Sequence, residues 1–166
     1  YGNMPLIEPQ EWKETHKIEE FVIVIDTSMS CSGDLVRKFL EETYHILAET
    51  ESFFRKVHIR ILQCDDAVRA DQLITTGEEL KQYMDHLQLY GDGGTDFRPA
   101  FTYVQQLIDQ GEFKNLKGLL YFTDGKGTFP RKRPPYDAAF ILFREDYKEV
   151  SVPPWAIRLM LDEEDL

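Results

Sequence analysis

The sequence predicts an α/β fold in which a doubly wound, mainly parallel central sheet lies between two layers of helices. Residues 21–25 and 118–122 are continuous apolar runs with β-branched or aromatic side chains, which is typical of strands buried on both faces. Stretches with apolar residues at helical spacing alternate with such runs along the chain. The chain has 166 residues, of which 42% are hydrophobic, so it is long enough to form one domain with its own core.

Four elements are predicted in the first half of the chain. Residues 21–25 form the first strand, and residues 34–55 carry apolar side chains every three or four positions, which predicts a helix. Residues 57–62 alternate between apolar and polar side chains, which indicates a second strand. Residues 65–76 are expected to turn back as a strand at the edge of the sheet.

Two helices follow, separated by a glycine-rich loop. Residues 77–89 show helical spacing, and residues 90–94 interrupt it with three glycines. The next helix is expected to begin at Thr95 or Asp96. It includes Pro99, which a helix tolerates in its first turn because the N–H that proline lacks has no partner there.

Three further strands complete the predicted sheet. Residues 118–122 form a buried strand that runs into a polar loop, and residues 138–143 form another. Residues 155–161 are expected to form the last strand, which an acidic tail follows.

The predicted elements make up a single domain over residues 21–166. Residues 1–20 are polar and punctuated by prolines, so we expect a linker or domain edge there. Since the chain begins with Tyr1 rather than Met, we also expect it to be a fragment of a longer protein.

The composition disfavours several classes of function. The chain has 19 basic and 30 acidic residues, and a net charge of −11 repels nucleic acid and anionic membrane surfaces. No stretch approaches the roughly 18 continuous apolar residues that a membrane span needs. Two cysteines, Cys31 and Cys64, are too few for a disulfide framework and favour a reducing compartment, so we expect a cytoplasmic protein. The histidines lack the paired spacing of zinc hydrolases.

Polar side chains follow the strand over residues 21–25 and the strand over residues 118–122. Asp26, Ser28 and Ser30 come at every second position after the first, and Asp124 follows the second. Because the carboxyl ends of parallel strands meet at one edge of a sheet, we expect these side chains to lie close together. Carboxylate and hydroxyl oxygens are hard ligands, which Mg²⁺, Mn²⁺ and Ca²⁺ prefer.

A third loop supplies another hydroxyl, that of Thr95, between glycines and a helix start. Taken singly, each of these residues is more simply explained as a helix cap or loop residue. The coincidence of five oxygen-bearing side chains in three loops favours a metal site. The glycines before Thr95 do not match the phosphate-binding pattern GxxxxGK[ST], so a phosphate cradle is the weaker interpretation.

These residues resemble the metal-ion-dependent adhesion site (MIDAS) of von Willebrand factor type A (VWA) domains, which have a Rossmann-like fold. The resemblance lies in D-x-S-x-S at residues 26–30, the threonine of GGTD and the aspartate of TDG. The sequences GGTDFRPAF, YFTDGKGTFP and PPW are similar to a bacterial VWA-like family that is fused to the C-terminal side of a metallopeptidase-like segment. The resemblance covers residues 21–161, and Met29 departs from it because many members carry glycine there.

The resemblance implies which residues hold the metal. Ser28, Ser30 and Thr95 would offer hydroxyls to Mg²⁺, or to Mn²⁺ or Ca²⁺, while Asp26 and Asp124 would act directly or through water. One coordination position would stay open for an Asp or Glu of a protein partner. Such a domain is a metal-dependent protein-interaction module and not an enzyme, and a MoxR-type AAA+ ATPase is a candidate partner by the same resemblance.

Two alternatives remain at this point. The chain could be a Mg²⁺-dependent hydrolase or phosphatase with Asp26 as nucleophile. Against this, strand-end aspartate enzymes of that kind place a second acid two residues later, where this chain has Ser28. The chain could also be the accessory domain of a metallopeptidase-like enzyme, with the chemistry in the missing N-terminal portion.

A basic cluster lies in the loop after Asp124. It consists of Lys126, Arg131, Lys132 and Arg133. Such a run is usually a solvated face, but on a chain with a net charge of −11 it could steer an acidic partner toward the metal.

Overall fold

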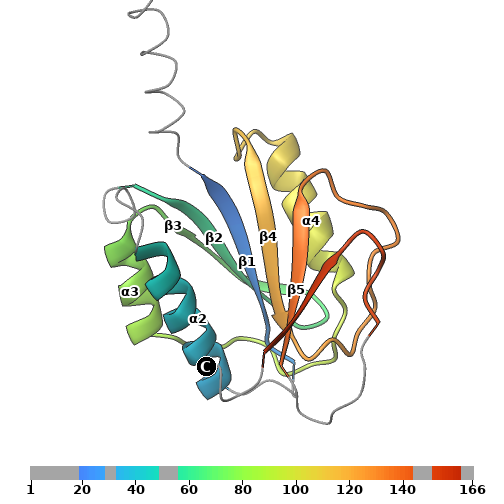
Figure 1. The fold of residues 1–166 in the computed structure, drawn as a ribbon, viewed down its shortest axis with the longest axis horizontal. Coiled ribbons are helices and arrows are strands. Elements are labelled where there is room, and N and C mark those ends of the chain that lie inside the picture. Colours follow the sequence, from blue (N-terminus) through green and yellow to red (C-terminus); the bar gives the residue numbers. More distant parts are fainter. Residues whose placement is uncertain (1–18, 29–32, 49–55, 144–150, 162–166) are drawn as a thin grey trace, which may run out of the picture.

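The computed structural model describes residues 19–28, 33–48, 56–143 and 151–161 (Figure 1). Its elements are β1 (Glu20–Asp26), α2 (Gly33–Ala48), β2 (His58–Cys64), β3 (Val68–Ile74), α3 (Gly77–Asp85), α4 (Arg98–Asp109), β4 (Leu116–Thr123), β5 (Asp137–Phe143) and β6 (Ile157–Leu161). The six strands form one sheet in the order β3-β2-β1-β4-β5-β6. Every neighbouring pair is parallel except β2 and β3. The predicted mainly parallel sheet is therefore confirmed.

The antiparallel strand β3 lies at one edge of the sheet, as predicted for residues 65–76. A tight turn joins it to β2, in which the Asp65 N–H donates to the Ala67 carbonyl at 3.2 Å. A turn this short can only join antiparallel strands, because a parallel connection needs a crossover of a dozen or more residues.

Helices cover both faces of the sheet, which confirms the three layers. Figure 1 shows α2 and α3 in front of the sheet and α4 behind it. The alternating side chains of β1 explain this arrangement, because Ile23 and Ile25 belong to the cluster with α2 and α3, whereas Val22 and Val24 belong to the cluster with α4. All four side chains are buried, so β1 is apolar without interruption.

The core under α4 is rich in aromatic side chains. Phe97 lies 5.0 Å from Tyr121, and Phe140 lies 5.4 Å from Tyr121, as measured between ring centroids. Phe129 joins this cluster at 4.7 Å from Phe97 and 4.9 Å from Phe140. The loop that follows β4 is thereby anchored on the core at Phe129.

Two helix boundaries differ from the prediction. The helix predicted to begin at Thr95 or Asp96 begins at Arg98, because Asp96 instead forms an isolated bridge with Thr128. The helix predicted over residues 77–89 ends at Asp85. The loop after it is held against β2, since the Tyr90 N–H donates to Gln63 Oε1 at 2.7 Å.

Several predicted boundaries lie outside the described residues. The linker and the acidic tail fall on residues 1–18 and 162–166, and the end of the first predicted helix falls on residues 49–55. The strand β1 begins at Glu20, one residue before its predicted start. No helix in the described ranges has the length and apolarity that a membrane crossing requires.

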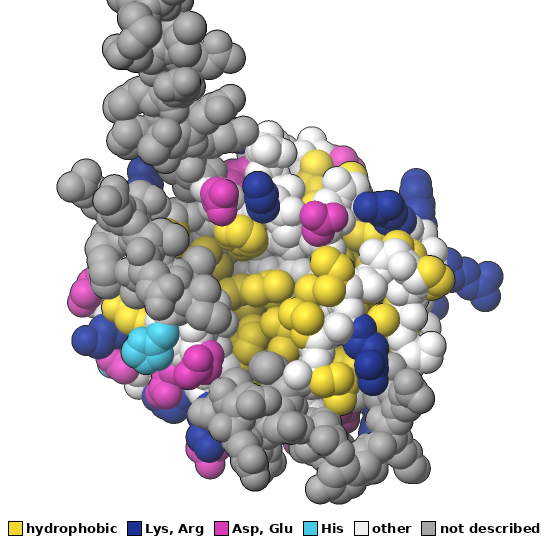
Figure 2. Space-filling model, in the orientation of Figure 1, with side chains coloured by type: hydrophobic (Ala, Val, Ile, Leu, Met, Phe, Trp, Pro, Cys, Tyr) yellow, Lys and Arg dark blue, Asp and Glu magenta, His cyan; other side chains and the backbone are white. Residues whose placement is uncertain are grey.

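One part of the sheet face that carries α2 and α3 is exposed. In β6, the side chains of Ile157 and Leu159 are 51% and 47% exposed. Leu159 pairs in parallel with Ile141, so it lies on the same face as the α2 and α3 cluster. Figure 2 shows apolar side chains gathered over the middle of this face. The described helices therefore cover the β1 and β2 side of this face and leave the β6 side open.

Candidate metal centre

The two predicted aspartates follow neighbouring strands at one edge of the sheet. Ile25 of β1 pairs in parallel with Phe122 of β4, so both strands end side by side. Asp26 is the last residue of β1, and Asp124 comes directly after β4. Both are buried, with relative exposures of 0% and 4%. The structure therefore places two carboxylates in the interior at the carboxyl edge of the sheet.

Both oxygens of Asp26 accept hydrogen bonds from the protein. Oδ1 accepts from the Ser28 N–H at 2.9 Å, and Oδ2 accepts from the Thr123 hydroxyl at 2.5 Å. Burial raises the pKa of Asp26, and the negative charge of Asp124 raises it further, although these hydrogen bonds lower it. The charged form of Asp26 is thus unfavourable in the protein alone, and a cation beside the two carboxylates would stabilise it.

Asp124 has one oxygen without a hydrogen-bond partner. Its Oδ1 accepts from the Lys126 N–H at 2.9 Å. Its Oδ2 is buried, and no group in the described ranges hydrogen-bonds to it. A buried carboxylate oxygen that lacks a partner is costly, and a divalent cation is a ligand that would satisfy it. The residues present therefore fit a hard cation.

Thr95 lies in the loop that packs against the loop of Asp124. A Cβ atom built on Gly127 would be only 2.8 Å from Thr95 Cγ2, so the two loops are in close contact. The Phe97 N–H donates to the Thr128 carbonyl at 3.0 Å, which joins the same two loops. Within the described part of the chain, the Thr95 hydroxyl forms no hydrogen bond.

The loop after β1 meets the glycine-rich loop in turn. Ser28 is 5% exposed, and the carbonyl of its neighbour Thr27 accepts from the Asp92 N–H at 3.0 Å. The loops that carry Asp26, Ser28, Thr95 and Asp124 therefore lie together at the carboxyl edge of the sheet. Ser30 and Met29 lie outside the described residues.

Two further residues belong to this edge, and neither is among the residues predicted from the sequence. Thr123 is fully buried and holds Asp26 through its hydroxyl, as described above. Asp65 is 2% exposed and accepts from the Gly93 N–H at 3.0 Å and from Arg69 Nε at 2.7 Å. It therefore holds the glycine-rich loop in place. A signal was available for Asp65, because it follows β2 at the same edge and obeys the same rule as Asp26 and Asp124.

The charge of Asp65 is well stabilised. Burial raises the pKa of its carboxyl, but the hydrogen bond from Arg69 and those from the backbone N–H groups of Gly93 and Ala67 outweigh burial and lower the pKa to about 2. Asp65 already has partners for both oxygens, which distinguishes it from Asp124. It is accordingly a positioning residue and not a candidate ligand.

The candidate site is of the mixed carboxylate and hydroxyl kind. In the described ranges, no three or more His, Cys, Asp or Glu side chains form a group that could hold a metal ion. The set at the carboxyl edge has only two carboxylates, and its other oxygens come from Ser and Thr. Such a site suits Mg²⁺, which accepts few protein carboxylates and keeps several waters.

We expect Gly91→Ala to destabilise the domain by about 2 kcal/mol or more. Gly91 has a φ of 146°, and a Cβ atom there would lie 2.4 Å from Thr27 Oγ1. In the same loop, Gly94 has no atom within 4 Å of an added Cβ, so Gly94→Ala is a matched control. It should change the free energy of unfolding by less than about 0.5 kcal/mol. Urea denaturation of both variants measures the difference, and equal effects would contradict the packing of Gly91 on Thr27.

A family model described as "VWA-like domain (DUF2201)" matches residues 21–162 of the chain. An aerotolerance-related membrane protein from Bacteroides fragilis is similar in structure, with a TM-score of 0.57, 11% identity and coverage of 89% of this chain and 93% of that chain. The SpRpn10 VWA domain has a TM-score of 0.54, with 12% identity over 87% of this chain and 88% of that chain. A von Willebrand factor type A protein from Catenulispora acidiphila has a TM-score of 0.51, with 15% identity over 79% of this chain and 34% of that chain.

No curated protein matches the chain. At identities this low the structural neighbours show the fold alone, which is the VWA fold that the sequence motifs imply. Domains of this fold are generally protein-interaction modules and generally not enzymes. Because the family model covers most of the sequence, the chain belongs to the VWA-like domain family (DUF2201).

Proposed function

We propose that this domain is a metal-dependent protein-interaction module of the MIDAS type. Ser28, Ser30 and Thr95 would offer hydroxyl oxygens to Mg²⁺, or to Mn²⁺ or Ca²⁺. Asp26 and Asp124 would complete the protein's share of the site. A carboxylate of a protein partner would then occupy the open coordination position of the cation.

The observation that carries this proposal is the environment of Asp124. Its Oδ2 is buried without a partner in the described ranges, next to a second buried carboxylate whose pKa is raised. This arrangement is unfavourable by itself and favourable with a divalent cation. Asp26 already accepts two hydrogen bonds, from Ser28 and Thr123, which supports a role for it through metal-bound water.

The partner proposed here is a protein that presents an acidic residue, and a MoxR-type AAA+ ATPase is the candidate. We further propose that the chain is the C-terminal domain of a larger cytoplasmic protein with a metallopeptidase-like segment upstream. The free, buried Cys64 is consistent with the reducing compartment that this location provides.

The contacts of Asp26 argue against the phosphatase alternative. A nucleophilic carboxylate must be accessible to its substrate, but Asp26 is 0% exposed and both of its oxygens are held by hydrogen bonds within the protein. Ser28, which stands where such enzymes place a general acid, donates its backbone N–H to Asp26. We therefore propose that the domain itself binds and does not hydrolyse.

Calorimetric titration with Mg²⁺, together with melting curves of the domain and of Asp26→Asn, tests this function. We expect Mg²⁺ at ten times its Kd to stabilise the unmodified domain by about 1.4 kcal/mol and to leave Asp26→Asn unchanged. In EDTA the Tm of the variant should be equal to or higher than that of the unmodified domain. The reason is that a raised pKa means that the ionised Asp26 destabilises the fold at neutral pH, and Asn removes that charge.

An equal response to Mg²⁺ in both proteins would place the cation elsewhere. Hydrolysis of p-nitrophenyl phosphate by the domain is the corresponding test of the phosphatase alternative. If that activity were present and disappeared in Asp26→Asn, the binding function would be wrong and the enzyme would be the better account.

A further inference from the structure

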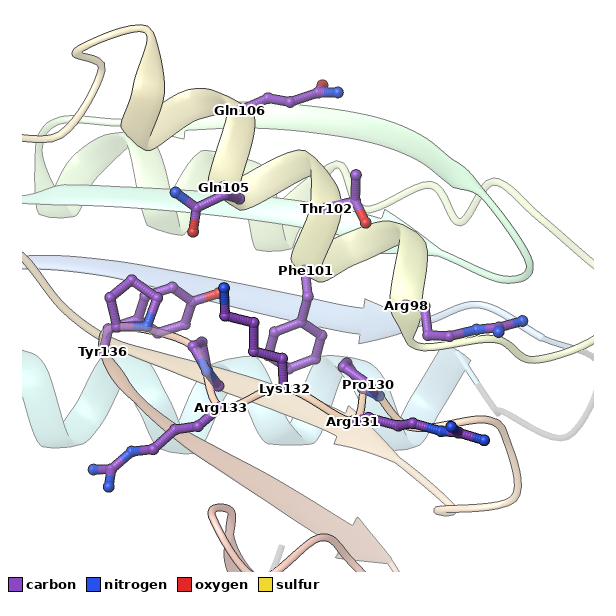
Figure 3. A pocket seen from close by; sticks show the side chains of 12 residues that line it. Arg98, Phe101, Thr102, Gln105, Gln106, Pro130, Arg131, Lys132, Arg133 and Tyr136 are labelled. Carbon is purple, nitrogen blue, oxygen red and sulfur yellow. The ribbon is translucent and has the colours of Figure 1, made fainter.

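A pocket of about 820 Å³ lies between α4 and residues 130–136, outside the candidate metal centre. Figure 3 shows its two walls. One is the exposed side of α4, with the uncharged side chains of Thr102, Gln105 and Gln106. The other is the segment that follows Phe129. The pocket is therefore a groove between a helix and a loop that begins at Asp124.

The floor of this groove belongs to the core, and prolines restrict the backbone of its loop wall. Phe101 and Tyr136 line it and are only 8% and 7% exposed, so they belong to the core and not to the solvent. Three prolines, Pro130, Pro134 and Pro135, occur in the loop wall and fix its backbone φ angles. A groove built in this way loses little conformational entropy when a ligand binds.

The loop wall also carries three cations. Arg131, Lys132 and Arg133 line the groove and are exposed, and none of them forms an ion pair with a residue in the described ranges. Arg98 lines it too, but pairs with Asp96 at 2.8 Å. On a chain with a net charge of −11, three neighbouring cations without acidic partners are a local exception. They favour an anionic ligand in the groove.

One end of the groove lies on the side of the candidate metal centre. Figure 3 shows Arg98 and Arg131 at the end of the pocket toward which the strand arrows point, which is the edge that carries Asp26 and Asp124. Asp96, two residues before Arg98, is bridged to Thr128 in the loop of Asp124. A chain segment that placed one carboxylate at the metal could thus continue along α4.

We propose that this groove binds an extended acidic segment of a protein partner. The segment's carboxylates would lie against Arg131, Lys132 and Arg133. Its backbone would lie against the side-chain hydroxyl of Thr102 and the side-chain amides of Gln105 and Gln106. A peptide fits better than a nucleic acid, since the aromatic side chains of the groove are buried and offer no face for base stacking. The proposal rests on the proposed function only in assuming that one partner occupies both the metal and the groove.

The test uses a fluorescein-labelled peptide of alternating Glu and Ala, with a Gln and Ala peptide for comparison, in EDTA and at low salt. The variant Arg131→Glu/Lys132→Glu/Arg133→Glu should bind the acidic peptide about tenfold or more weakly, with a faster dissociation rate. The control variant Lys38→Glu/Lys56→Glu/Lys81→Glu has the same change in net charge away from the groove, on exposed residues of α2, α3 and the segment before β2. Its affinity should stay within about twofold.

Four results would overturn the proposal. The first is equal weakening in both variants, which would show an effect of net charge alone. The second is a loss confined to the association rate, because cations that only steer a partner change encounter and not the bound state. The third is tighter binding of an oligothymidylate than of the acidic peptide. The fourth is a gain in affinity for the acidic peptide on deletion of residues 162–166 that equals the loss in the groove variant. Such a gain would make the chain's own acidic tail the occupant.

Because the peptide assay is run in EDTA, its failure is separable from that of the metal site. If the proposal about the groove is wrong, calorimetric Mg²⁺ binding and its loss in Asp26→Asn are unaffected. If the proposal about the metal site is wrong, the two charge-reversal variants still differ in their affinity for the acidic peptide in EDTA.

Discussion

Thr95→Val is expected to abolish Mg²⁺-dependent binding of a protein partner while the domain stays folded. The hydroxyl of Thr95 forms no hydrogen bond in the described ranges, so removing it breaks no contact of the fold. The methyl group of Thr95 does have a structural role, because it lies against Gly127 in the loop of Asp124. Valine keeps that methyl group and removes only the oxygen, which would be one of few protein ligands of a hard cation.

The complementary variant Thr95→Ser separates the role of the hydroxyl as a metal ligand from the role of the methyl group in packing. It keeps the hydroxyl and loses the methyl, so it should retain Mg²⁺-dependent binding and lose about 1 kcal/mol of stability. Ser28→Ala should behave as Thr95→Val does in the binding assay. Interferometry against an immobilised MoxR-type AAA+ ATPase, with Mg²⁺ and with EDTA, measures binding, and calorimetry with Mn²⁺ measures the cation directly. Partner binding that survives both EDTA and Thr95→Val would leave this domain with the fold of its family and without the metal function.

The sequence predicts the middle of the sheet better than its surroundings. The strands β1 and β4 are evident because both of their faces are buried, so burial itself makes their sequences continuously apolar. A second rule, that ligands bind at the carboxyl ends of parallel strands, points to the edge where Asp26 and Asp124 are found. Those predictions depend on local sequence and on the general geometry of parallel sheets.

The remaining features depend on contacts between distant parts of the chain. Local signals favour a helix start at Thr95, with its hydroxyl as a cap, yet Asp96 is bridged to Thr128 and the helix begins only at Arg98. The Asp96 N–H donates to the Asp65 carbonyl at 3.0 Å, so a residue of the β2 end also fixes that boundary. Neither partner is visible in a window of sequence around Thr95.

The cations of the loop after β4 illustrate the same limit. As a sequence, residues 131–133 predict only a positive surface near the site. The packing of Phe129 on Phe97 and Phe140 determines that this loop runs beside α4, and it thereby forms the groove. A run of charges becomes one wall of a pocket only through that tertiary contact.

Asp65→Asn is expected to have a large effect on stability, comparable with that of Gly91→Ala. Asp65 accepts hydrogen bonds from Arg69, Ala67 and Gly93, and its pKa falls from 3.8 to about 2. A carboxyl whose pKa is lowered in the folded state stabilises that state above its unfolded pKa. The lowering corresponds to about 2 kcal/mol at neutral pH. Asparagine also replaces one acceptor oxygen with an N–H donor, which leaves one of these groups unpaired.

The pH dependence of this loss identifies its cause. The contribution of ionised Asp65 is complete above roughly pH 5 and is lost as the pH falls through about 2, because the proton then neutralises the unmodified carboxyl as well. Urea denaturation should therefore show a difference of about 2 kcal/mol or more between the domain and Asp65→Asn at pH 7 that narrows as the pH approaches 2.

Asp66→Asn is the matched control for this measurement. Asp66 pairs with the same Arg69 at 2.8 Å, but its side chain is 55% exposed, so its replacement should cost less than about 1 kcal/mol. The contact from Gly93 to Asp65 also holds the glycine-rich loop in which Thr95 lies, so Asp65→Asn should weaken Mn²⁺ binding while Asp66→Asn should not. Equal losses in the two variants, or a difference that does not change with pH, would show that the charge of Asp65 does not position this loop.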